Sequence, residues 1–298
     1  MDKSTAERIA KRFVGLALEQ RRQILDKMHE TGQSFRLLPI AVTRHDSPRI
    51  PLSYAQQRML FLWQLEPHSS FYNVPTAVRL DGPLNLAALT RALEALVQRH
   101  ESLRTRFVSE DGEYHQQVLD DVPLDLQVIE LQPVAGEEPE QCLAQHVRQA
   151  LEAPFDLLEG PLLRVRLLRV AADQHVLAVC LHHIVSDGWS GELMVQEFVQ
   201  LYEALSEGRD PQLPALTVQY ADYAIWPDYA IWQRAWLEAG EGERQLQYWR
   251  EQLGDEHPLL ALPLDHERPA QPSYRGATLR CDVGSRPRRA ATATPCSC

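Results

Sequence analysis

Two hydrophobic periods alternate along the middle of the chain. Apolar runs, or apolar residues alternating with polar ones, are typical of strands and occur at residues 74–80, 124–131, 163–170 and 175–181. Apolar side chains recur at helical spacing over residues 84–99, 141–151 and 191–205. The mixture of crossover helices with a hairpin over 163–181 predicts an α/β fold, with a mixed sheet and flanking helices.

The first 38 residues carry a helical pattern of their own. Apolar residues at helical spacing predict two short helices within residues 3–31, and Gly32 is the expected C-terminal stop. Prolines mark residues 39–50 as a linker. Two interpretations remain open for residues 1–38: a helical lead-in that packs on the body of the protein, or a docking segment for another protein.

Two later segments depart from an ordinary domain pattern. The five residues Asp222–Trp226 are repeated at Asp228–Trp232, and we interpret them as a small tandem duplication accommodated as a kink. After Gly284 the apolar periodicity ends and the composition changes. Residues 285–298 are therefore predicted to form a disordered tail that does not belong to the domain before it.

Composition narrows the class of protein. The chain has 298 residues, 44% of them hydrophobic, and a net charge of −11, which argues against a general nucleic-acid binder. No stretch approaches the roughly 20 apolar residues of a membrane span, and the N-terminus does not resemble a secretory signal. We expect a cytoplasmic protein. Of the five cysteines, Cys180 lies within an apolar strand and is predicted to be a small buried side chain, and no metal site is predicted.

The residues with the clearest chemistry follow the strand 175–181. His182 and His183 stand where that strand ends, and Asp187 and Gly188 come four and five positions after His183. An imidazole titrates near neutral pH, so a rigidly held histidine that a substrate can reach is suited to act as a base. Neighbouring strand residues point to opposite faces, so one histidine of the pair is expected to face a substrate. Taken alone, the motif also fits a structural, hydrogen-bonded histidine.

Four motifs in one order resemble the condensation domains of nonribosomal peptide synthetases. The run from His182 to Ser190 is similar to the active-site motif of that family, which has two histidines, three variable residues, Asp and Gly. The other three similar segments are Ser53–Leu65, which contains Arg58, Arg99–Phe107 and Tyr220–Trp226. The resemblance places the domain at residues 51–284. Within the family, the sequence resembles pseudomonad synthetases that make siderophores of the pyoverdine type.

The resemblance implies a fold of two lobes like chloramphenicol acetyltransferase, with a tunnel between them and the histidine motif near its middle. The matching region ends near the start of the second lobe, and the later family motifs are absent. We therefore expect the first lobe and the start of the crossover, with the second lobe mostly missing. A chain of this kind is expected to be inactive alone.

The resemblance also implies the chemistry. An acceptor amine attacks a donor acyl thioester, and both substrates are carried by peptidyl or aminoacyl carrier domains. His183 is the expected catalytic residue, as a base for the amine or as a hydrogen-bonding group that holds it, and His182 is secondary. No cofactor or metal is expected on the chain itself, because phosphopantetheine arrives with the carrier domains. An upstream synthetase is a candidate partner for residues 1–38.

The remaining motif residues are expected to support His183. Asp187 is predicted to hold the loop by pairing with Arg58, since an Arg–carboxylate pair can be bidentate and directional. Gly188 is predicted to allow a close approach to substrate or to a neighbouring element. Trp189 and Ser190 begin the next helix, where Ser190 either contributes a hydroxyl near the reacting centre or caps the helix. Structural roles are expected for Glu101 and Arg104 of the second motif and for Trp63 of the first.

Two alternatives to the condensation interpretation remain. An epimerization domain or a small acyltransferase shares the histidine motif, although the Ser53–Leu65 motif favours condensation. A remnant without catalytic activity that binds a carrier domain or another synthetase is the other alternative. Product formation separates this binding role from an enzyme.

Overall fold

A computed structural model describes residues 3–35, 38–40, 49–132, 138–214, 216, 227–255, 263, 264 and 267. Among the described residues, the helices and strands all belong to one compact unit that spans residues 1–257. The predictions for the Tyr220–Trp226 motif, for the first copy of the duplication and for the tail at 285–298 lie outside the described residues.

A four-stranded mixed sheet forms the centre of this unit. Its strands are β2 (Asn73–Asp81), β7 (Gln174–His182), β6 (Leu163–Ala171) and β5 (Asp125–Glu130), in that spatial order. β5 and β6 are parallel, whereas β2, β7 and β6 pair antiparallel. The predicted strands and the predicted hairpin are confirmed. The hairpin ends at His182, so the histidine motif begins where β7 leaves the sheet.

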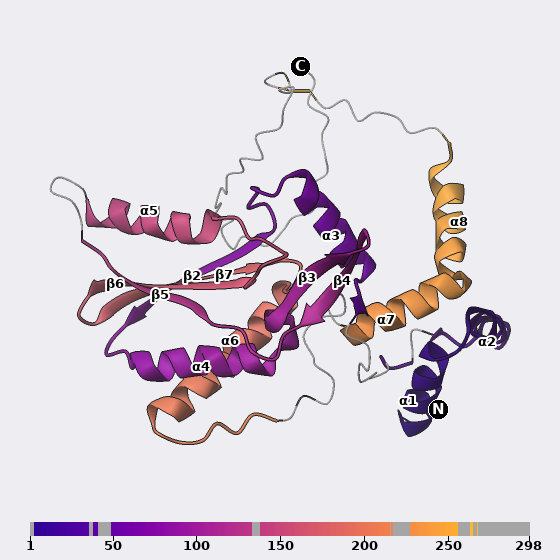
Figure 1. Cartoon of the computed structure of the whole chain (residues 1–298), viewed down its shortest axis with the longest axis horizontal. Coiled ribbons are helices and arrows are strands. Elements are labelled where there is room, and N and C mark those ends of the chain that lie inside the picture. Colours follow the sequence, from indigo (N-terminus) through magenta and orange to yellow (C-terminus); the bar gives the residue numbers. More distant parts are fainter. Residues whose placement is uncertain are drawn as a thin grey trace, which may run out of the picture. The chain divides into compact units, whose positions relative to one another are not determined.

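Helices cover both faces of this sheet (Figure 1). α4 (Leu86–Arg99) and α6 (Gly188–Ser206) lie together on one face, and α5 (Pro139–Glu152) lies on the other. The main core joins the α4–α6 layer to the sheet and includes Leu89, Leu93, Leu96, Val165, Leu167 and Leu177. Val176 and Leu168 point to the opposite face, where they pack with Leu143 of α5. The alternation of side chains along β6 and β7 therefore builds a core on each side.

A smaller sheet and the helix α3 form the part of the fold that the sequence pattern did not predict. β1 (Ile50–Pro51), β4 (Glu113–Val118) and β3 (Thr105–Glu110) make an antiparallel sheet, and a single turn, η2 (Glu101–Arg104), precedes β3. α3 (Tyr54–Leu65) is the first family motif, and Met59 and Leu60 pack with Phe107 of β3. Ile184 and Val185 belong to the same cluster, so this layer supports the loop after the histidines.

The N-terminal helices pack on a helix from the far end of the described chain. α1 (Lys3–Val14) and α2 (Leu18–Glu30) contact α7 (Pro227–Trp236). Phe35 stands at the centre of this contact, with ring centroids 4.5 Å from Phe13, 5.5 Å from Trp232 and 5.8 Å from Trp236. Both interpretations of residues 1–38, a lead-in or a docking segment, stay predictions. The second copy of the duplication lies in α7, which begins at Pro227, where a proline is tolerated in the first turn.

A helical break follows α7. The π-helical turn η3 (Leu237–Glu241) contains Gly240 at φ 117°, and α8 (Gly242–Leu253) then continues in a new direction. Only glycine adopts such a positive φ without strain, so Gly240 fixes this kink. Gly32 ends α2 with φ 66°, as the sequence predicted.

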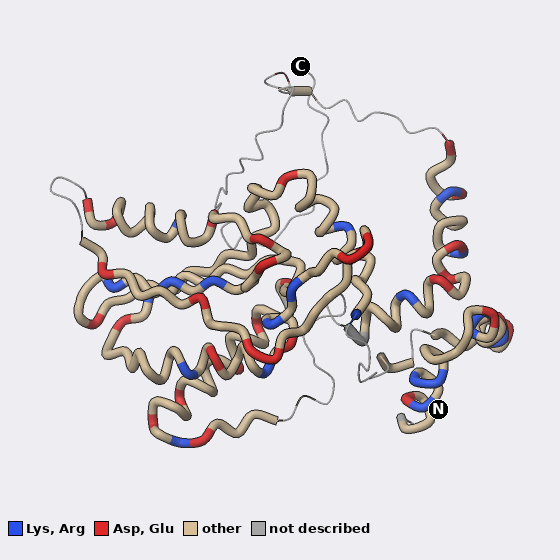
Figure 2. Tube along the Cα trace, viewed as in Figure 1, with Lys and Arg blue, Asp and Glu red and all other residues tan. Residues whose placement is uncertain are grey.

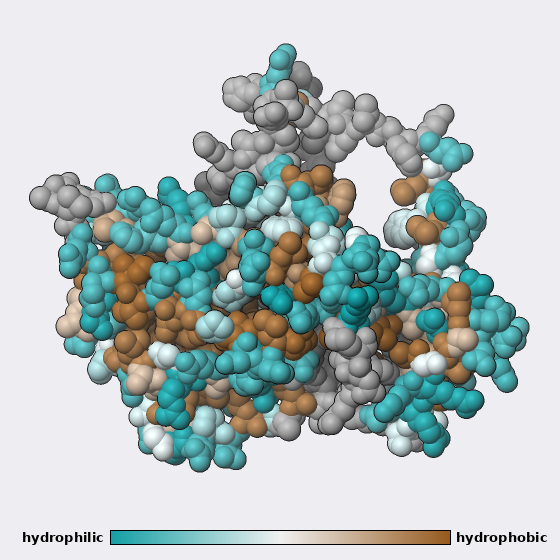
Figure 3. Space-filling model, in the orientation of Figure 1, coloured by the Kyte–Doolittle hydropathy of each residue, from teal (hydrophilic) through white to brown (hydrophobic). Residues whose placement is uncertain are grey.

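The surface of the described residues combines interspersed charge with exposed apolar side chains. Acidic and basic residues are mixed along most elements (Figure 2). Apolar surface lies along the edge of the large sheet and over α8 (Figure 3), where Trp249 is 56% and Leu253 is 61% exposed. On α3, Phe61 and Leu65 are also exposed. Within the described ranges, none of the helices is long and apolar enough to cross a membrane.

Candidate functional site

The two histidines lie in opposite environments, as the alternation along a strand predicts. His182 is buried, and its ring lies edge-on to Phe155 at 6.1 Å. His183 is exposed, and its backbone N–H donates to the carbonyl of Tyr72 at 2.8 Å. Its ring lies edge-on to that of Tyr72 at 6.5 Å. Of the pair, His183 is therefore the imidazole that is exposed at the surface.

His182 is held neutral inside the fold. Its Nδ1 accepts a hydrogen bond from the backbone N–H of Ile184 at 3.1 Å, so its proton resides on Nε2. Burial lowers its pKa to about 4, and the neighbouring His183 contributes to the same shift. A buried neutral group that accepts a backbone hydrogen bond holds the loop in place, and the secondary role in catalysis stays a prediction for His182.

Asp187 and Ser190 form the N-terminal cap of α6. The Asp187 carboxylate accepts from the backbone N–H of Ser190 at 3.0 Å. The Ser190 hydroxyl accepts from the backbone N–H of Asp187 at 2.8 Å and donates to the Asp187 carbonyl at 3.0 Å. Ser190 is buried, and both hydrogen bonds of its hydroxyl stay within the cap. The contacts therefore support the capping alternative for Ser190.

The predicted pair between Arg58 and Asp187 is wrong. Arg58 lies on the exposed side of α3, and the structure, which describes both residues, shows no ion pair between them. Arg58 projects from the exposed side of α3, whereas the Asp187 carboxylate lies at the start of α6. A family motif places two residues in the same domain, but the rotation of α3 decides which of its side chains face the loop.

Gly188 is the first residue of α6 and is exposed. A Cβ built at Gly188 would meet no described atom within 4 Å, and its φ is not in the left-handed region. The predicted close approach to a neighbouring element is therefore not found among the described residues. An approach to substrate stays a prediction. Trp189 lies in the first turn of α6, and its side chain is outside the described part of the structure.

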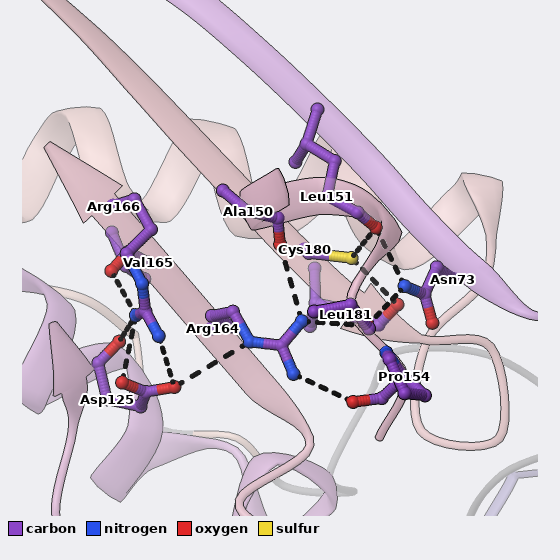
Figure 4. Close-up of polar contacts among 11 residues, drawn as sticks. Asn73, Asp125, Ala150, Leu151, Pro154, Arg164, Val165, Arg166, Cys180 and Leu181 are labelled. Carbon is purple, nitrogen blue, oxygen red and sulfur yellow. Dashed lines mark hydrogen bonds and ion pairs between the residues drawn. The ribbon is translucent and has the colours of Figure 1, made fainter. Parts of the chain in front are cut away.

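Arg164 forms hydrogen bonds to the chain at the end of α5 (Figure 4), just before Phe155, which packs against His182. Its guanidinium donates to the carbonyls of Ala153 at 2.9 Å and Pro154 at 3.0 Å, at the end of α5, and stacks 4.3 Å from the centroid of Phe155. These carbonyls have no partner within the helix, so the arginine satisfies them and fixes the chain that leads to Phe155. Nothing in the hydrophobic pattern indicates this role.

The same network uses Cys180 and Asn73. The Cys180 thiol donates to the Leu151 carbonyl at 3.4 Å, and the Asn73 amide donates to the same carbonyl at 2.7 Å. Burial raises the pKa of Cys180 to about 11, with a small opposing effect from Arg164. A neutral buried thiol is not a nucleophile, so the prediction of a small buried side chain is confirmed.

The second family motif anchors α6. Glu197 of α6 accepts from Arg99 through both carboxylate oxygens at 3.1 Å and lies 2.6 Å from Nε2 of His100. His100 is fully buried, and burial lowers its pKa against the opposing effect of Glu197. Arg104 donates to the carbonyl of Leu119. The motif thus holds α6, the helix that follows the histidine loop. This contact is structural, as the sequence predicted for the motif.

Two further features bear on what the site can bind. A cavity of about 730 Å³ lies between α3, β1 and the β3–β4 turn, and its lining includes Arg49, Glu110 and Arg234 but not His183. No group of three or more His, Cys, Asp or Glu side chains that could hold a metal ion occurs in the described ranges.

Trp63 donates its indole N–H to the Phe155 carbonyl at 3.0 Å, so it is a packing residue, as predicted.

These elements define an α/β lobe with a strand-end histidine motif, and comparisons with known proteins identify its class. The chain is 32% identical to the X-domain of teicoplanin biosynthesis in its complex with OxyB, with a TM-score of 0.67, and the match covers 79% of this chain and 49% of that one. The first condensation domain of the calcium-dependent antibiotic synthetase gives 26% identity, a TM-score of 0.60, and coverage of 71% and 49%. The fold is one of the two lobes of such domains.

The chain belongs to the condensation domain family, whose model matches residues 47–294. The match runs beyond both boundaries of the predicted domain at 51–284. One of the linear gramicidin synthase proteins of Brevibacillus parabrevis is 44% identical over 229 residues, which are 77% of this chain and 3% of the relative. Enniatin synthase of Fusarium equiseti is 42% identical over 241 residues, which are 80% and 7%. The chain therefore spans a small part of these synthetases and about half of the solved domains.

Proposed function

We propose that the chain forms the histidine-bearing half of a condensation domain that makes amide bonds between substrates on carrier proteins. The nitrogen of the acceptor amine attacks the carbonyl carbon of the donor thioester. A C–N bond forms, the C–S bond breaks, the donor carrier keeps the thiol, and the amine loses a proton. His183 either takes this proton or positions the amine by a hydrogen bond.

The observation that carries the proposal is the separation of the two histidines. His182 is buried, neutral and hydrogen-bonded to the loop, whereas His183 is exposed on a backbone fixed at the end of β7. An acid–base group must be reachable by the reacting amine, and an exposed imidazole satisfies this condition. The second wall of the site would come from the other half of the domain, so the chain alone is expected to be inactive.

A reconstituted domain tests the proposal. The chain is to be joined to the second half of a related condensation domain, and donor and acceptor carriers loaded with amino acids are to be supplied. Dipeptidyl thioester is the expected product. His183→Ala is expected to reduce its rate by about 10²- to 10⁴-fold if His183 is a base, without a change in thermal stability, because the side chain is exposed. Equal rates for the two proteins would overturn the assignment of His183.

A second candidate function is binding without catalysis. The observation that favours it is the similarity to a teicoplanin X-domain that is solved in complex with OxyB. For this chain we propose carrier domains, and an upstream synthetase through residues 1–38, as the partners. A chain that captures a loaded carrier but gives no product even in the reconstituted domain would support the binding role. The epimerization alternative is tested in the same assay by inversion of the donor amino acid.

The finer predictions concern the product and cofactors. A siderophore of the pyoverdine type stays a prediction, and the relatives described above, which are named for linear gramicidin, enniatin and teicoplanin, do not support it. We propose that the chain binds no cofactor of its own and meets phosphopantetheine as the arm of its carrier substrates. Mass spectrometry of the intact chain after incubation with loaded carriers tests this, since the arm should stay on the carriers.

A further inference from the structure

A buried amide joins the start of α3 to the loop that follows the two histidines. Gln56 lies in the first turn of α3 and is 0% exposed. Its Nε2 donates to the carbonyl of Ile184, the residue after His183, at 3.5 Å. These residues are 128 positions apart in the sequence, so the contact depends on the tertiary fold.

The amide of Gln56 makes a complete set of hydrogen bonds. Its Oε1 accepts from the backbone N–H of Ser53 at 2.9 Å, and its Nε2 also donates to Oε1 of Gln116 at 2.9 Å. Gln116 is itself fully buried on β4 and donates to the carbonyl of Pro51 at 2.9 Å. A buried amide with its donors and acceptor satisfied is fixed in orientation, because any rotation would leave polar atoms unpaired.

Three hydrogen bonds hold the backbone of His183 and Ile184. The N–H of His183 donates to the carbonyl of Tyr72, and the N–H of Ile184 donates to Nδ1 of His182. The carbonyl of Ile184 accepts from Gln56. The first two contacts come from β7 and the segment that leads into its neighbouring strand, and the third comes from α3 alone. Gln56 therefore adds a hydrogen bond to the apolar packing that joins the histidine loop to the layer of α3 and the small sheet.

We infer that Gln56, with Gln116 behind it, is a positioning residue for His183. It acts through the peptide of Ile184 and touches no substrate. The inference rests on the proposed function of His183, since a positioned imidazole matters only where that side chain acts. The loop geometry itself, however, is measurable without any reaction.

Amide hydrogen exchange of the 298-residue chain provides the test. Gln56→Met keeps the length of the side chain and removes its hydrogen bonds. We expect the amides of His183, Ile184 and Val185 to exchange roughly tenfold faster, since loss of a buried hydrogen bond shifts an opening equilibrium by about that factor. Amides of the core strands β6 and β7 are expected to keep their protection. The matched control is Gln57→Met, the exposed neighbour on the same helix, which should leave the loop unchanged.

The outcomes are distinct. Unchanged exchange at residues 183–185 in Gln56→Met would overturn the inference, and so would a uniform rise across the whole chain, which would show a role in overall stability instead. Should the variant fail to fold, the side-chain amide protons of Gln56 in the unsubstituted chain decide. They are expected to exchange at least roughly tenfold more slowly than those of Gln57, because both donors are engaged in a buried site. Equal rates would overturn the inference.

The exchange result is independent of the proposed function. If the loop loosens in Gln56→Met but His183→Ala keeps its rate in the reconstituted domain, the positioning stands and the catalytic assignment fails. If His183→Ala loses its rate and the loop is unaffected by Gln56→Met, the positioning fails alone. Where both hold, Gln56→Met is expected to lower kcat more than it changes KM, which a general loss of folded protein would not do.

Discussion

The hydroxyl of Ser190 and the main chain of Asp187 exchange two hydrogen bonds, at 2.8 Å and 3.0 Å, while the Asp187 carboxylate bonds back to the N–H of Ser190. This reciprocal arrangement satisfies donors at the start of α6 that have no partner inside the helix. Because α6 begins at Gly188, the cap also fixes where the histidine loop ends. The acidic residue of the histidine motif thus has a structural task in this chain.

The cap makes a prediction about stability. Asp187→Ala and Ser190→Ala are each expected to lower the free energy of unfolding by about 0.5–2 kcal/mol, and the double variant by less than the sum, because the two side chains belong to one unit. Arg58→Ala is expected to change it by less than about 0.5 kcal/mol, since its side chain is exposed. Urea unfolding of these four variants, of the Arg58→Ala/Asp187→Ala double variant and of the unsubstituted chain is the measurement. A strong coupling between Arg58 and Asp187 would contradict the structure.

A second prediction concerns pH. The pKa of His182 falls to about 4 in the fold, so the unfolded chain binds a proton below about pH 6.5 that the folded chain refuses. Stability should therefore be fully present above about pH 6.5 and decline as the pH falls toward 4. Protonation of His182 is expected to lower the free energy of unfolding by on the order of 3 kcal/mol once the pH has fallen to about 4. His100 shifts in the same direction and adds to the decline.

His182→Gln isolates the effect, because glutamine does not titrate. The variant is expected to be less stable than the unsubstituted chain at pH 7.5 and to approach it as the pH falls to 4.5. Melting temperatures across this range provide the measurement, with His183→Gln as the exposed control. Parallel curves for His182→Gln and the unsubstituted chain would show that His182 is not the group responsible.

The third prediction addresses the arginine under the site. Arg164→Met leaves the terminal carbonyls of α5 without their charged donor and is expected to cost about 1.5–3 kcal/mol. Arg164→Lys should recover only part of this, since an ammonium group cannot reach the same carbonyls in a planar fork. Arg169→Met, which removes an exposed pair with Glu130, is the control and should cost no more than about 1 kcal/mol. Equal losses for Arg164→Met and Arg169→Met would refute the role of Arg164.

The fourth prediction tests the packing of the N-terminal helices on α7. Phe35→Ala is expected to cost about 3–5 kcal/mol, because its ring is 3% exposed and packs on three other aromatic rings. Hydrogen exchange in α7 should rise with it, although α7 lies far away in the sequence. Leu18→Ala, at an exposed position of α2, should have little effect. If α7 kept its protection in Phe35→Ala, the front helices would be a separate docking segment.

The elements that were predicted correctly are those with one clean period. β6 and β7 alternate on both faces of a buried sheet, and α4 carries Leu89, Leu93 and Leu96 on one side. α3 was missed because it carries apolar side chains around much of its surface, including Phe61 and Leu65, which are exposed. The sequence nevertheless carries a signal for the start of α3, the capping box of Ser53 and Gln56. The turn Asp111–Gly112, with φ 55° and 83°, marks the missed hairpin in the same way.

The residues of the candidate site also fall into those that the sequence indicated and those that it did not. His182 and His183 were found because strand alternation and a family resemblance point to the same residues. Phe155, Arg164 and Glu197 could not be found, since each acts through contacts with segments distant in the sequence, and a single sequence carries no sign of such pairings. The Arg58–Asp187 pair failed for the same reason. Gln56 stood within a recognised motif, but its partner, a backbone carbonyl, has no residue type to reveal it.

The stacking of Phe35 on Trp232 can form only after both residues have been synthesised. Trp232 is translated about 200 codons after Phe35, which corresponds to roughly 10–40 s at about 5–20 residues per second. During that interval the apolar side chains that pack on α7 in the finished fold lack that partner. The order of synthesis therefore lets the contact between the N-terminal helices and α7 form only after most of this lobe has been made.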